Sequence, residues 1–315
     1  RRHTRYWRDW SSDVCSSDLA ISLVRYGWLE VLVGDVIDHA VRNIITLILV
    51  FTGLVSLLIW FLKESTFPPR VKKTVAGFLV LSIILALASL RIEGVSGDLV
   101  PQFAFRWQAR RDSLLPSAAT LAHQSSNKNM SSEWTATADD FPCFLGPEGT
   151  ASLDGVELDT NWQANPPQCI WRRPIGAGWS GFATYGNHAV TLEQRGNDES
   201  ISCYALETGE PEWVVSVPAR HETVLGGIGP RSTPTIRDGV VYATGATGWL
   251  HAIEGSTGKI LWRKDIVADL GIDRATHASA VAWGRSGSPL VTENLVDRKS
   301  TRLNSSHANI SYAVF

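Results

Sequence analysis

The sequence lacks the residue patterns that mark several common classes of enzyme and of nucleic-acid-binding protein. It contains no phosphate-binding glycine loop, no Cys/His spacing typical of a metal site and no Ser, His and Asp order typical of a hydrolase. It also lacks an excess of positive charge, since 29 Lys and Arg face 31 Asp and Glu. Electrostatics therefore give no reason to expect nucleic acid as a partner.

The two ends of the sequence follow neither a helical nor a strand period. Residues 1–19 (RRHTRYWRDWSSDVCSSDL) and 298–315 (RKSTRLNSSHANISYAVF) resemble translated sequencing-adapter read-through, so we set both aside. Genuine disordered tails are the alternative. The two ends take 7 of the 29 basic and 3 of the 31 acidic residues, which leaves residues 20–297 with a net charge of −6.

Two uncharged runs predict a pair of transmembrane helices within residues 43–96. Residues 43–62 form a run of 20 and residues 74–90 a run of 17, and about 20 helical residues cross a hydrocarbon core of about 30 Å. Neither run has the polar face of a soluble helix, although a pair of buried soluble helices is the alternative. The basic connection 63–73 contains Pro68-Pro69, which predicts a turn there.

The positive-inside rule places that basic loop in the cytoplasm. The C-terminal part would then lie on the periplasmic side of a bacterial inner membrane, although Arg106, Arg110 and Arg111 give a contrary signal. Residues 20–42 could form an interfacial helix or part of another span, so two spans are a minimum. Residues 97–140, rich in Ser, Ala, Thr and Asn from Arg110 onward, predict a flexible linker.

Residues 141–297 contain a repeat with a period of 49 residues. Residues 202–213 align without gaps on residues 251–262, and residues 188–196 align on 240–248 at an offset of 52. We place the difference of three residues in a longer turn at 197–200. The matched positions that define the repeat are Thr208, Gly209 and Trp213 in the first copy and Thr257, Gly258 and Trp262 in the second.

Each copy predicts four short strands, which together make one blade of a β-propeller. The Gly of each Thr-Gly pair suits a turn with positive φ, and the Trp can fill the gap to a neighbouring blade. Pro211 fits the outermost strand, where an edge N–H has no partner. The strands are predicted near residues 181–185, 188–194, 201–206 and 212–217, and near residues 233–237, 240–244, 249–253 and 260–266.

The second copy, AIEGSTGKILW at residues 252–262, resembles the pyrroloquinoline-quinone-like (PQQ-like) repeat A-x-D-x-x-T-G-x-x-x-W. Glu254 replaces the usual Asp, and the first copy has Cys203 and Ala205 at the Ala and Asp positions. The resemblance covers roughly residues 141–296. It implies an all-β propeller fragment behind an α-helical transmembrane hairpin. It implies no single activity, because the family includes quinoprotein dehydrogenases and outer-membrane assembly scaffolds.

The flanks of the two copies resemble incomplete blades. Residues 169–175 resemble an outer strand that carries Trp171, and residues 286–295 resemble the first strand of a third blade. We therefore expect a truncated propeller from which further blades are missing. Cys203 is predicted to be a buried small hydrophobe. Cys143 and Cys169 could form a disulfide in an oxidising compartment, but spacing alone leaves the pairing open.

The glycine-rich connections 176–182, 226–234 and 284–289 are expected to line one mouth of the propeller channel. A polar binding surface is predicted there, although the arginines could instead bind loop carbonyls of their own blade. Residues 193–195 are predicted to form a solvated turn rather than a ligand site. The candidate surface residues are Arg231, Arg285, His221, Glu222 and His277.

The leading functional hypothesis is a membrane-anchored, envelope-facing binding or scaffold protein. Its propeller face or edges would contact a protein partner. The alternative is a membrane-bound quinoprotein dehydrogenase of alcohols or sugars, and an electron-transfer or sensor subunit is a third class. For the enzyme, the resemblance implies pyrroloquinoline quinone with Ca²⁺, held by a Trp, acidic and Asn ligands and sometimes an adjacent Cys-Cys pair. Residues 20–297 contain no such pair and no acidic set assignable to Ca²⁺, so no cofactor is evident.

Overall fold

The computed structural model describes residues 39–121, 134–152, 155, 158–224, 226–292, 295–301 and 307–313, with backbone alone from 297 onward. The excluded segment 1–19 and residues 20–38 lie outside this part of the chain. The chain divides into two compact units, residues 1–108 and residues 109–315. Each unit is described by itself.

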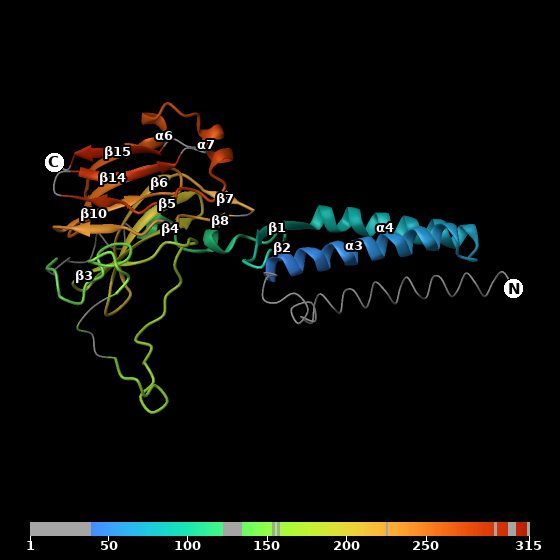
Figure 1. Cartoon of the computed structure of the whole chain (residues 1–315), viewed down its shortest axis with the longest axis horizontal. Helices are drawn as coiled ribbons and strands as arrows, with labels where there is room; N and C mark the ends of the chain where they lie inside the picture. The colour runs from blue at the N-terminus through green and yellow to red at the C-terminus, as the bar shows by residue number, and fades with distance from the viewer. Residues whose placement is uncertain are drawn as a thin grey trace. The chain divides into compact units, whose positions relative to one another are not determined.

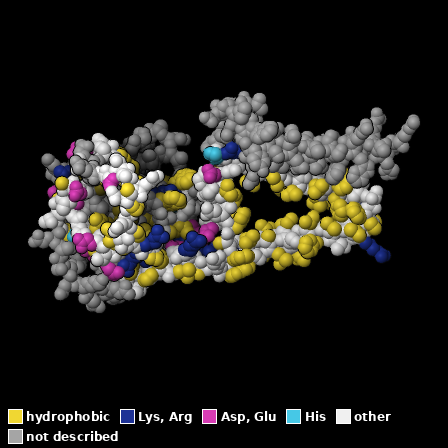
Figure 2. All heavy atoms as spheres, turned by 90° about the horizontal axis from the view of Figure 1, so that it is seen from below, with side chains coloured by type: hydrophobic (Ala, Val, Ile, Leu, Met, Phe, Trp, Pro, Cys, Tyr) yellow, Lys and Arg dark blue, Asp and Glu magenta, His cyan; other side chains and the backbone are white. Residues whose placement is uncertain are grey.

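The described part of the first unit is built on two long helices, α3 (His39–Lys63) and α4 (Pro69–Ser89), which run antiparallel (Figure 1). Both are long and apolar enough to cross a membrane. Their apolar side chains are exposed along the helices, as Figure 2 shows. The predicted turn is confirmed, but it is shorter than residues 63–73. Pro69 begins α4 because a first-turn residue needs no backbone N–H.

Part of the predicted linker 97–140 carries secondary structure, and residues 122–133 of it lie outside the described residues. In the first unit, β1 (Leu90–Val95) and β2 (Pro101–Phe105) form an antiparallel hairpin. Arg106 donates from Nε to the carbonyl of Leu90 at 3.0 Å. In the second unit, the 3-10 helix η1 (Arg111–Leu114) buries Asp112, because its carboxylate pairs with Arg220 at 2.6 Å.

The second unit contains two four-stranded antiparallel sheets, each with its strands in chain order (Figure 1). We call the first sheet blade A and the second blade B. The strands confirm the eight predicted positions to within about two residues at most ends. Blade A consists of β3 (Ala183–Tyr185), β4 (His188–Arg195), β5 (Asp198–Ala205) and β6 (Pro211–Pro218). Blade B consists of β9 (Thr235–Arg237), β10 (Val240–Thr244), β11 (Trp249–Glu254) and β12 (Ile260–Asp265).

The turn predicted at residues 197–200 is shorter than expected. β4 and β5 pair as far as Arg195 and Asp198, so the connection is short. The additional residues lengthen the two strands, which have 8 residues each, against 5 and 6 in β10 and β11. The longer ladder between β4 and β5 takes in these residues.

A third sheet follows blade B. It contains β13 (Leu290–Val291), β14 (Leu295–Thr301) and β15 (His307–Ala313). β13 lies within residues 286–295, where the first strand of a third blade is predicted. The backbone thus forms strands over part of the excluded segment 298–315, and the read-through assignment of that segment stays a prediction.

The sheets pack face to face in the order of the chain. Alternate side chains of blade B point to opposite sides, as strand geometry requires. Val241, Ala243 and Ile253 join blade A in one core, whereas Tyr242 and Leu250 join Val296 of the third sheet in another. The innermost strands β3, β9 and β13 lie next to one another. Thr235, for example, donates from its hydroxyl to the carbonyl of Pro289 at 2.6 Å.

The repeat motif joins each blade to the next. Gly209 and Gly258 have φ of +68° and +72°, which confirms the predicted turn. Trp213 of blade A is 4% exposed and donates from its indole to the Gly255 carbonyl of blade B at 2.6 Å. A Cβ on Gly258 would lie 2.7 Å from the Trp213 side chain. The predicted contact of the Trp with a neighbouring blade is therefore confirmed.

Trp171 makes the equivalent contact with blade A, one repeat earlier in the chain. Its indole donates to the Leu206 carbonyl of blade A at 2.7 Å, and Leu206 precedes Gly255 by 49 residues. A Cβ on Gly209 would lie 2.5 Å from the Trp171 ring. Residues 169–175 thus use their tryptophan as an outer strand would, although the structure assigns no strand there.

Two shorter pairs of elements complete the second unit. The strands β7 (Glu222–Thr223) and β8 (Gly227–Ile228) form a small hairpin between the two blades in sequence. The helices α6 (Ile266–Asp269) and α7 (Arg274–Ala280) lie between β12 and β13 in sequence. Asp265 and Asp273 cap them, since each accepts backbone N–H groups of the first helical turn.

Candidate functional site

The connections between blades present an arginine held between two tryptophans. The Arg231 guanidinium carbon lies 5.3 Å from the ring centre of Trp179 and 5.4 Å from that of Trp283. The two rings are 68% and 55% exposed. Successive members of this trio are 52 residues apart, so each comes from the same place in consecutive blade connections. We call these three residues the Trp-Arg-Trp surface.

Arg231 has no carboxylate partner among the described residues, and its Nε is buried without a hydrogen bond there. Burial lowers the pKa of this guanidinium from its ordinary value, yet an arginine stays protonated in proteins. The predicted alternative, in which the arginines bind loop carbonyls of their own blade, is not the arrangement found at Arg231. Its charge is offset by the faces of two aromatic rings, which attract cations.

The other predicted surface residues lie close by, but most of them contact other residues of this protein. Arg285 is buried and donates from Nε to Nε2 of His277 at 2.8 Å. Glu222 accepts from Arg110 and Arg220, each at 2.8 Å. The structure therefore brings the five predicted residues to one region, and within it only Arg231 is turned toward exposed rings.

His221 is buried beneath this region. A Cβ on Gly284 would lie 2.9 Å from its Nε2, which has no hydrogen-bond partner among the described residues. Burial, and then the charge of Arg231, lower the pKa of His221. Both effects favour the neutral form of this imidazole. Its backbone carbonyl also holds Gly229 at 2.9 Å, which fixes the connection leading to Arg231.

The predicted solvated turn at residues 193–195 is wrong, because all three side chains are buried. Glu193 accepts from Arg195 at 2.9 Å, from Tyr204 at 2.9 Å and from Ser202 at 2.5 Å, and it also accepts the backbone N–H of Gly176. Burial, and then the charge of Glu193, raise the pKa of Tyr204 to about 12. These residues form a closed network that holds the end of blade A, not a site open to a ligand.

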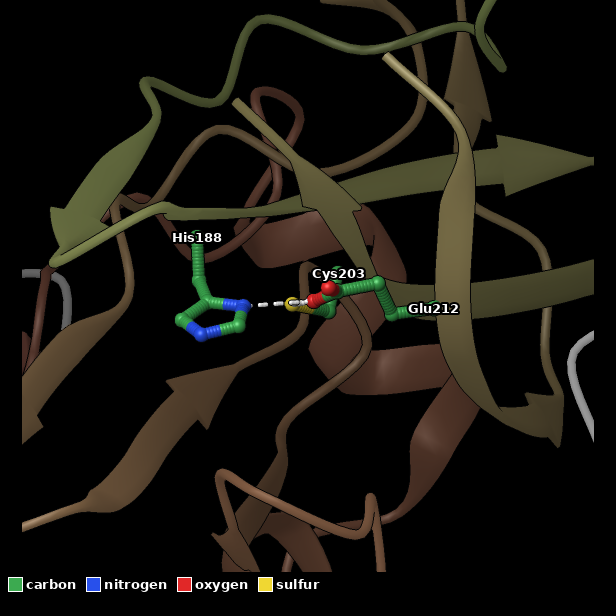
Figure 3. Close-up of side chains that lie close together, drawn as sticks. All are labelled: His188, Cys203 and Glu212. Carbon is green, nitrogen blue, oxygen red and sulfur yellow. Dashed lines mark hydrogen bonds and ion pairs between the residues drawn. The ribbon is translucent and has the colours of Figure 1, made fainter. Parts of the chain in front are cut away.

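A second cluster lies inside blade A, where His188, Cys203 and Glu212 meet (Figure 3). His188 Nδ1 lies 2.6 Å from Glu212 Oε2, and the Cys203 thiol donates to the same oxygen at 3.2 Å. His188 and Cys203 are buried and Glu212 is half-buried. Burial, and then the charge of Glu212, raise the pKa of Cys203 well above its ordinary value.

A β-bulge brings this cluster together. Cys203 pairs with Trp213 and Tyr204 pairs with Pro211, so Glu212 is the additional residue of β6. A bulge redirects the side chain of such a residue, and here it points toward Cys203. The prediction of Cys203 as a buried small hydrophobe is right about its burial and its place in the core, but it missed these two polar partners.

Cys143 and Cys169, whose pairing the sequence leaves open, form no disulfide, since the three cysteines in the described part of the chain are free. Cys143 donates from its thiol to the Gly146 carbonyl at 3.0 Å. Cys169 is exposed beside Trp171 and contacts the carbonyl of that residue at 3.3 Å.

Comparison with known proteins identifies the repeat. A family profile described as outer membrane protein assembly factor BamB matches residues 170–311. Over that range, which is just under half of the chain, the propeller part resembles the PQQ-like repeat family. The fold and the repeat predicted from the sequence are thereby confirmed. No curated protein sequence matches the chain.

Solved structures that resemble the chain include two natural proteins and one designed protein. Quinohemoprotein alcohol dehydrogenase from Comamonas testosteroni is 16% identical over 58% of this chain and 26% of its own length, with a TM-score of 0.35. BamB from Moraxella catarrhalis is 14% identical over 38% of this chain and 45% of its own length, with a TM-score of 0.23. The designed Ika8 protein is 13% identical, covers 43% of this chain and 45% of its own length, and has a TM-score of 0.20. This chain thus spans less than half the length of each.

The described residues do not fit a quinone with its Ca²⁺ ion. Ca²⁺ takes six to eight oxygen ligands, roughly. Near Arg231 the carboxylate of Glu222 is already engaged by two arginines. The buried carboxylate of Glu193 is saturated by its own network. We therefore derive no chemical step through a quinone in this part of the chain.

Proposed function

We propose that this chain is a membrane-anchored binding protein whose PQQ-like propeller recognises a protein partner through the Trp-Arg-Trp surface. One observation carries the proposal: a guanidinium between two exposed indole rings, with no carboxylate partner in the described part of the chain. Exposed Trp and Arg side chains that cluster together are typical of the residues that dominate protein–protein binding energy. The family description, which names an assembly factor, supports a binding role.

The charge of Arg231 defines the partner further. A carboxylate can dock in the plane of the guanidinium while the rings cover its faces, and such charge-assisted bonds are stronger than neutral ones. The hairpin β7–β8 borders the same surface, since a Cβ on Gly227 would lie 3.4 Å from the Trp179 indole nitrogen. We therefore propose an acidic peptide segment that also carries an aromatic or apolar residue.

The binding proposal is tested with the purified full chain in detergent and with labelled peptides that carry one Glu between two aromatic residues. Replacing that Glu by Gln in the peptide should weaken binding by about ten-fold, as should Arg231→Gln or Trp179→Ala in the protein. The matched controls Arg172→Gln and Trp162→Ala change exposed residues elsewhere. Equal binding by all four variants, or by both peptides, contradicts the proposal.

We further propose that α3 and α4 anchor the chain in an inner membrane, with the propeller on the periplasmic side. The exposed thiol of Cys169 permits a direct test in a Cys15→Ser background. A membrane-impermeant maleimide should label Cys169 in intact spheroplasts. A thiol introduced by Glu64→Cys, in the turn between the helices of a chain that also carries Cys169→Ser, should react only after permeabilisation. The reverse labelling pattern contradicts the orientation, and release of the chain by alkaline carbonate contradicts the anchor.

A further inference from the structure

The most informative feature outside the proposed binding surface is the cluster of His188, Cys203 and Glu212 in blade A. Each residue offers one ligand atom, and the three atoms lie within 4.8 Å of one another. An imidazole, a thiol and a carboxylate that converge in this way are three of the ligand types that zinc takes in proteins. Figure 3 shows all three side chains directed to one point.

The fold of a blade does not require these residues. The equivalent positions of blade B, at offsets of 52 for the first and 49 for the other two, are Val240, Ala252 and Leu261. The same bulge occurs there, because Ala252 pairs with Trp262 and Ile253 pairs with Ile260. Blade B therefore keeps its register and its bulge with three apolar residues. The polar set of blade A must serve a purpose other than the strand ladder.

We infer that His188, Cys203 and Glu212 form a binding site for one Zn²⁺ ion. The charges favour this metal, since a thiolate and a carboxylate together neutralise a divalent cation in a buried place, and the imidazole adds a neutral ligand. Binding displaces the proton of the Cys203 thiol to solvent, and the metal–sulfur bond forms in its place. No oxidant or reductant takes part.

The geometry needs a local adjustment, since the three ligand atoms lie within 4.8 Å of one another but not at tetrahedral separations. Tetrahedral zinc holds nitrogen and oxygen ligands about 3.3 Å apart, so Glu212 Oε2 must withdraw from His188 by roughly 0.7 Å. Glu212 can do so because it is the additional residue of a bulge and its side chain is partly exposed. The same exposure admits a water molecule as fourth ligand, as in zinc sites with three protein ligands.

The surroundings hold the imidazole in place. The Trp134 ring stacks on His188 with centroids 4.6 Å apart and planes at 17°. A Cβ on Gly255 of blade B would lie 2.2 Å from that same Trp134 ring. Trp134 therefore lies against His188 of blade A and against a turn of blade B. A metal bound to His188 would act between two blades, and this predicts that zinc stabilises their contact.

The site is tested by titrating the reduced full chain in detergent with Co²⁺, which reports a thiolate ligand by a sulfur-to-cobalt charge-transfer band. One equivalent should produce the band, and Zn²⁺ should displace it. Cys203→Ala should abolish it, while His188→Val and Glu212→Leu should each weaken Co²⁺ binding by at least about ten-fold. These variants carry the residues of blade B. The control Cys143→Ala removes a half-buried thiol elsewhere and should bind as the unchanged chain does.

A second measurement guards against variants that fail to fold. Zn²⁺ should raise the melting temperature of the unchanged chain by about 4 °C or more when it is in large excess over its Kd, and Mg²⁺ should not. The inference is overturned if the unchanged chain gives no stoichiometric thiolate band. It is equally overturned if Cys143→Ala loses the band and Cys203→Ala keeps it.

Discussion

Blade A and blade B share one strand arrangement but bury different side chains. Both place a glycine with positive φ after Thr, and both carry a bulge one residue before the tryptophan of the motif. Outside this motif, blade A buries Glu193, Arg195 and Glu199. The positions of blade B equivalent to Glu193 and Arg195 are occupied by Gly245 and Thr247.

The difference shows which positions of the repeat are tied to packing between blades. The tryptophan and the glycine meet across the blade boundary, so a change in either would move the neighbouring sheet. The side chains at the ends of the strands differ between the two copies, even where they reach the neighbouring blade. Glu199 of blade A, for example, accepts from the backbone N–H of Ala246 at 2.6 Å and so holds a turn of blade B. Such positions can change in pairs while the strand arrangement of the blade is kept.

The largest effect is expected from removing the shared contact itself. Trp213→Ala deletes a buried ring and its bond to Gly255, and should lower the free energy of unfolding by about 4 kcal/mol. Trp171→Ala removes the same contact one step earlier, but that ring is 37% exposed, so the loss should be about half as large. Urea unfolding of the full chain in detergent, followed by tryptophan fluorescence and circular dichroism, measures both. Equal losses would show that burial does not set the strength of this contact.

The next effect concerns the network that blade A has and blade B lacks. Glu193→Gln leaves the buried guanidinium of Arg195 without its carboxylate and should cost about 3 kcal/mol, because an unpaired buried charge is strongly destabilising. Burial alone would lower the pKa of Arg195, but its bond to Glu193 and the charge of that group raise it overall. The control Glu207→Gln changes an exposed glutamate of the same blade. A similar result for both variants would contradict a structural role for the network.

Blade B should be the more sensitive of the two blades to acid. His251 is buried, neither ring nitrogen has a hydrogen-bond partner among the described residues, and burial, followed by the charge of Arg263, lowers its pKa from 6.5 to about 4. Between these values the unfolded chain binds a proton that the folded chain excludes, so stability is lost as pH falls from 6.5 toward 4. At pH 4.5 the loss should reach about 2.5 kcal/mol relative to pH 7.5.

The control for this effect comes from blade A, where Ser202 stands at the position of His251. His251→Ser should flatten the dependence of the unfolding free energy on pH between 4.5 and 7, since the titrating group is gone. Carboxylates titrate in both proteins, so the difference between their two profiles is the quantity to compare. Identical profiles for the two proteins would show that His251 does not carry the acid sensitivity.

The strands could be predicted from the sequence because each motif residue has a local reason for its place. Gly209 and Gly258 need positive φ, and Pro211 needs an edge strand. The Trp-Arg-Trp surface was only partly predicted. Arg231 was named, but Trp179 and Trp283 were not, although the spacing of 52 residues on either side of Arg231 was a usable signal.

The metal-ligand cluster could not be predicted in the same way. Glu212 turns toward Cys203 only because β6 contains a bulge, and a gapless alignment of the two copies gives no sign of where a bulge lies. The network of Glu193 was missed for a related reason. Charged residues at a strand end suggest solvent, whereas here the backbone N–H of Gly176, from a distant connection, completes the burial.

The smallest effect is expected from making blade A more like blade B. The triple variant His188→Val, Cys203→Ala and Glu212→Leu should change the unfolding free energy by less than about 1 kcal/mol in the presence of a chelator. Exchanging a buried polar set for apolar residues is often neutral or stabilising. His188→Val alone should cost more, about 1–2 kcal/mol, because it leaves the carboxylate of Glu212 facing an apolar side chain. Urea unfolding in the presence of EDTA measures the change in unfolding free energy of each variant. A triple variant less stable than the single one would mean that the polar set itself holds blade A together without any metal.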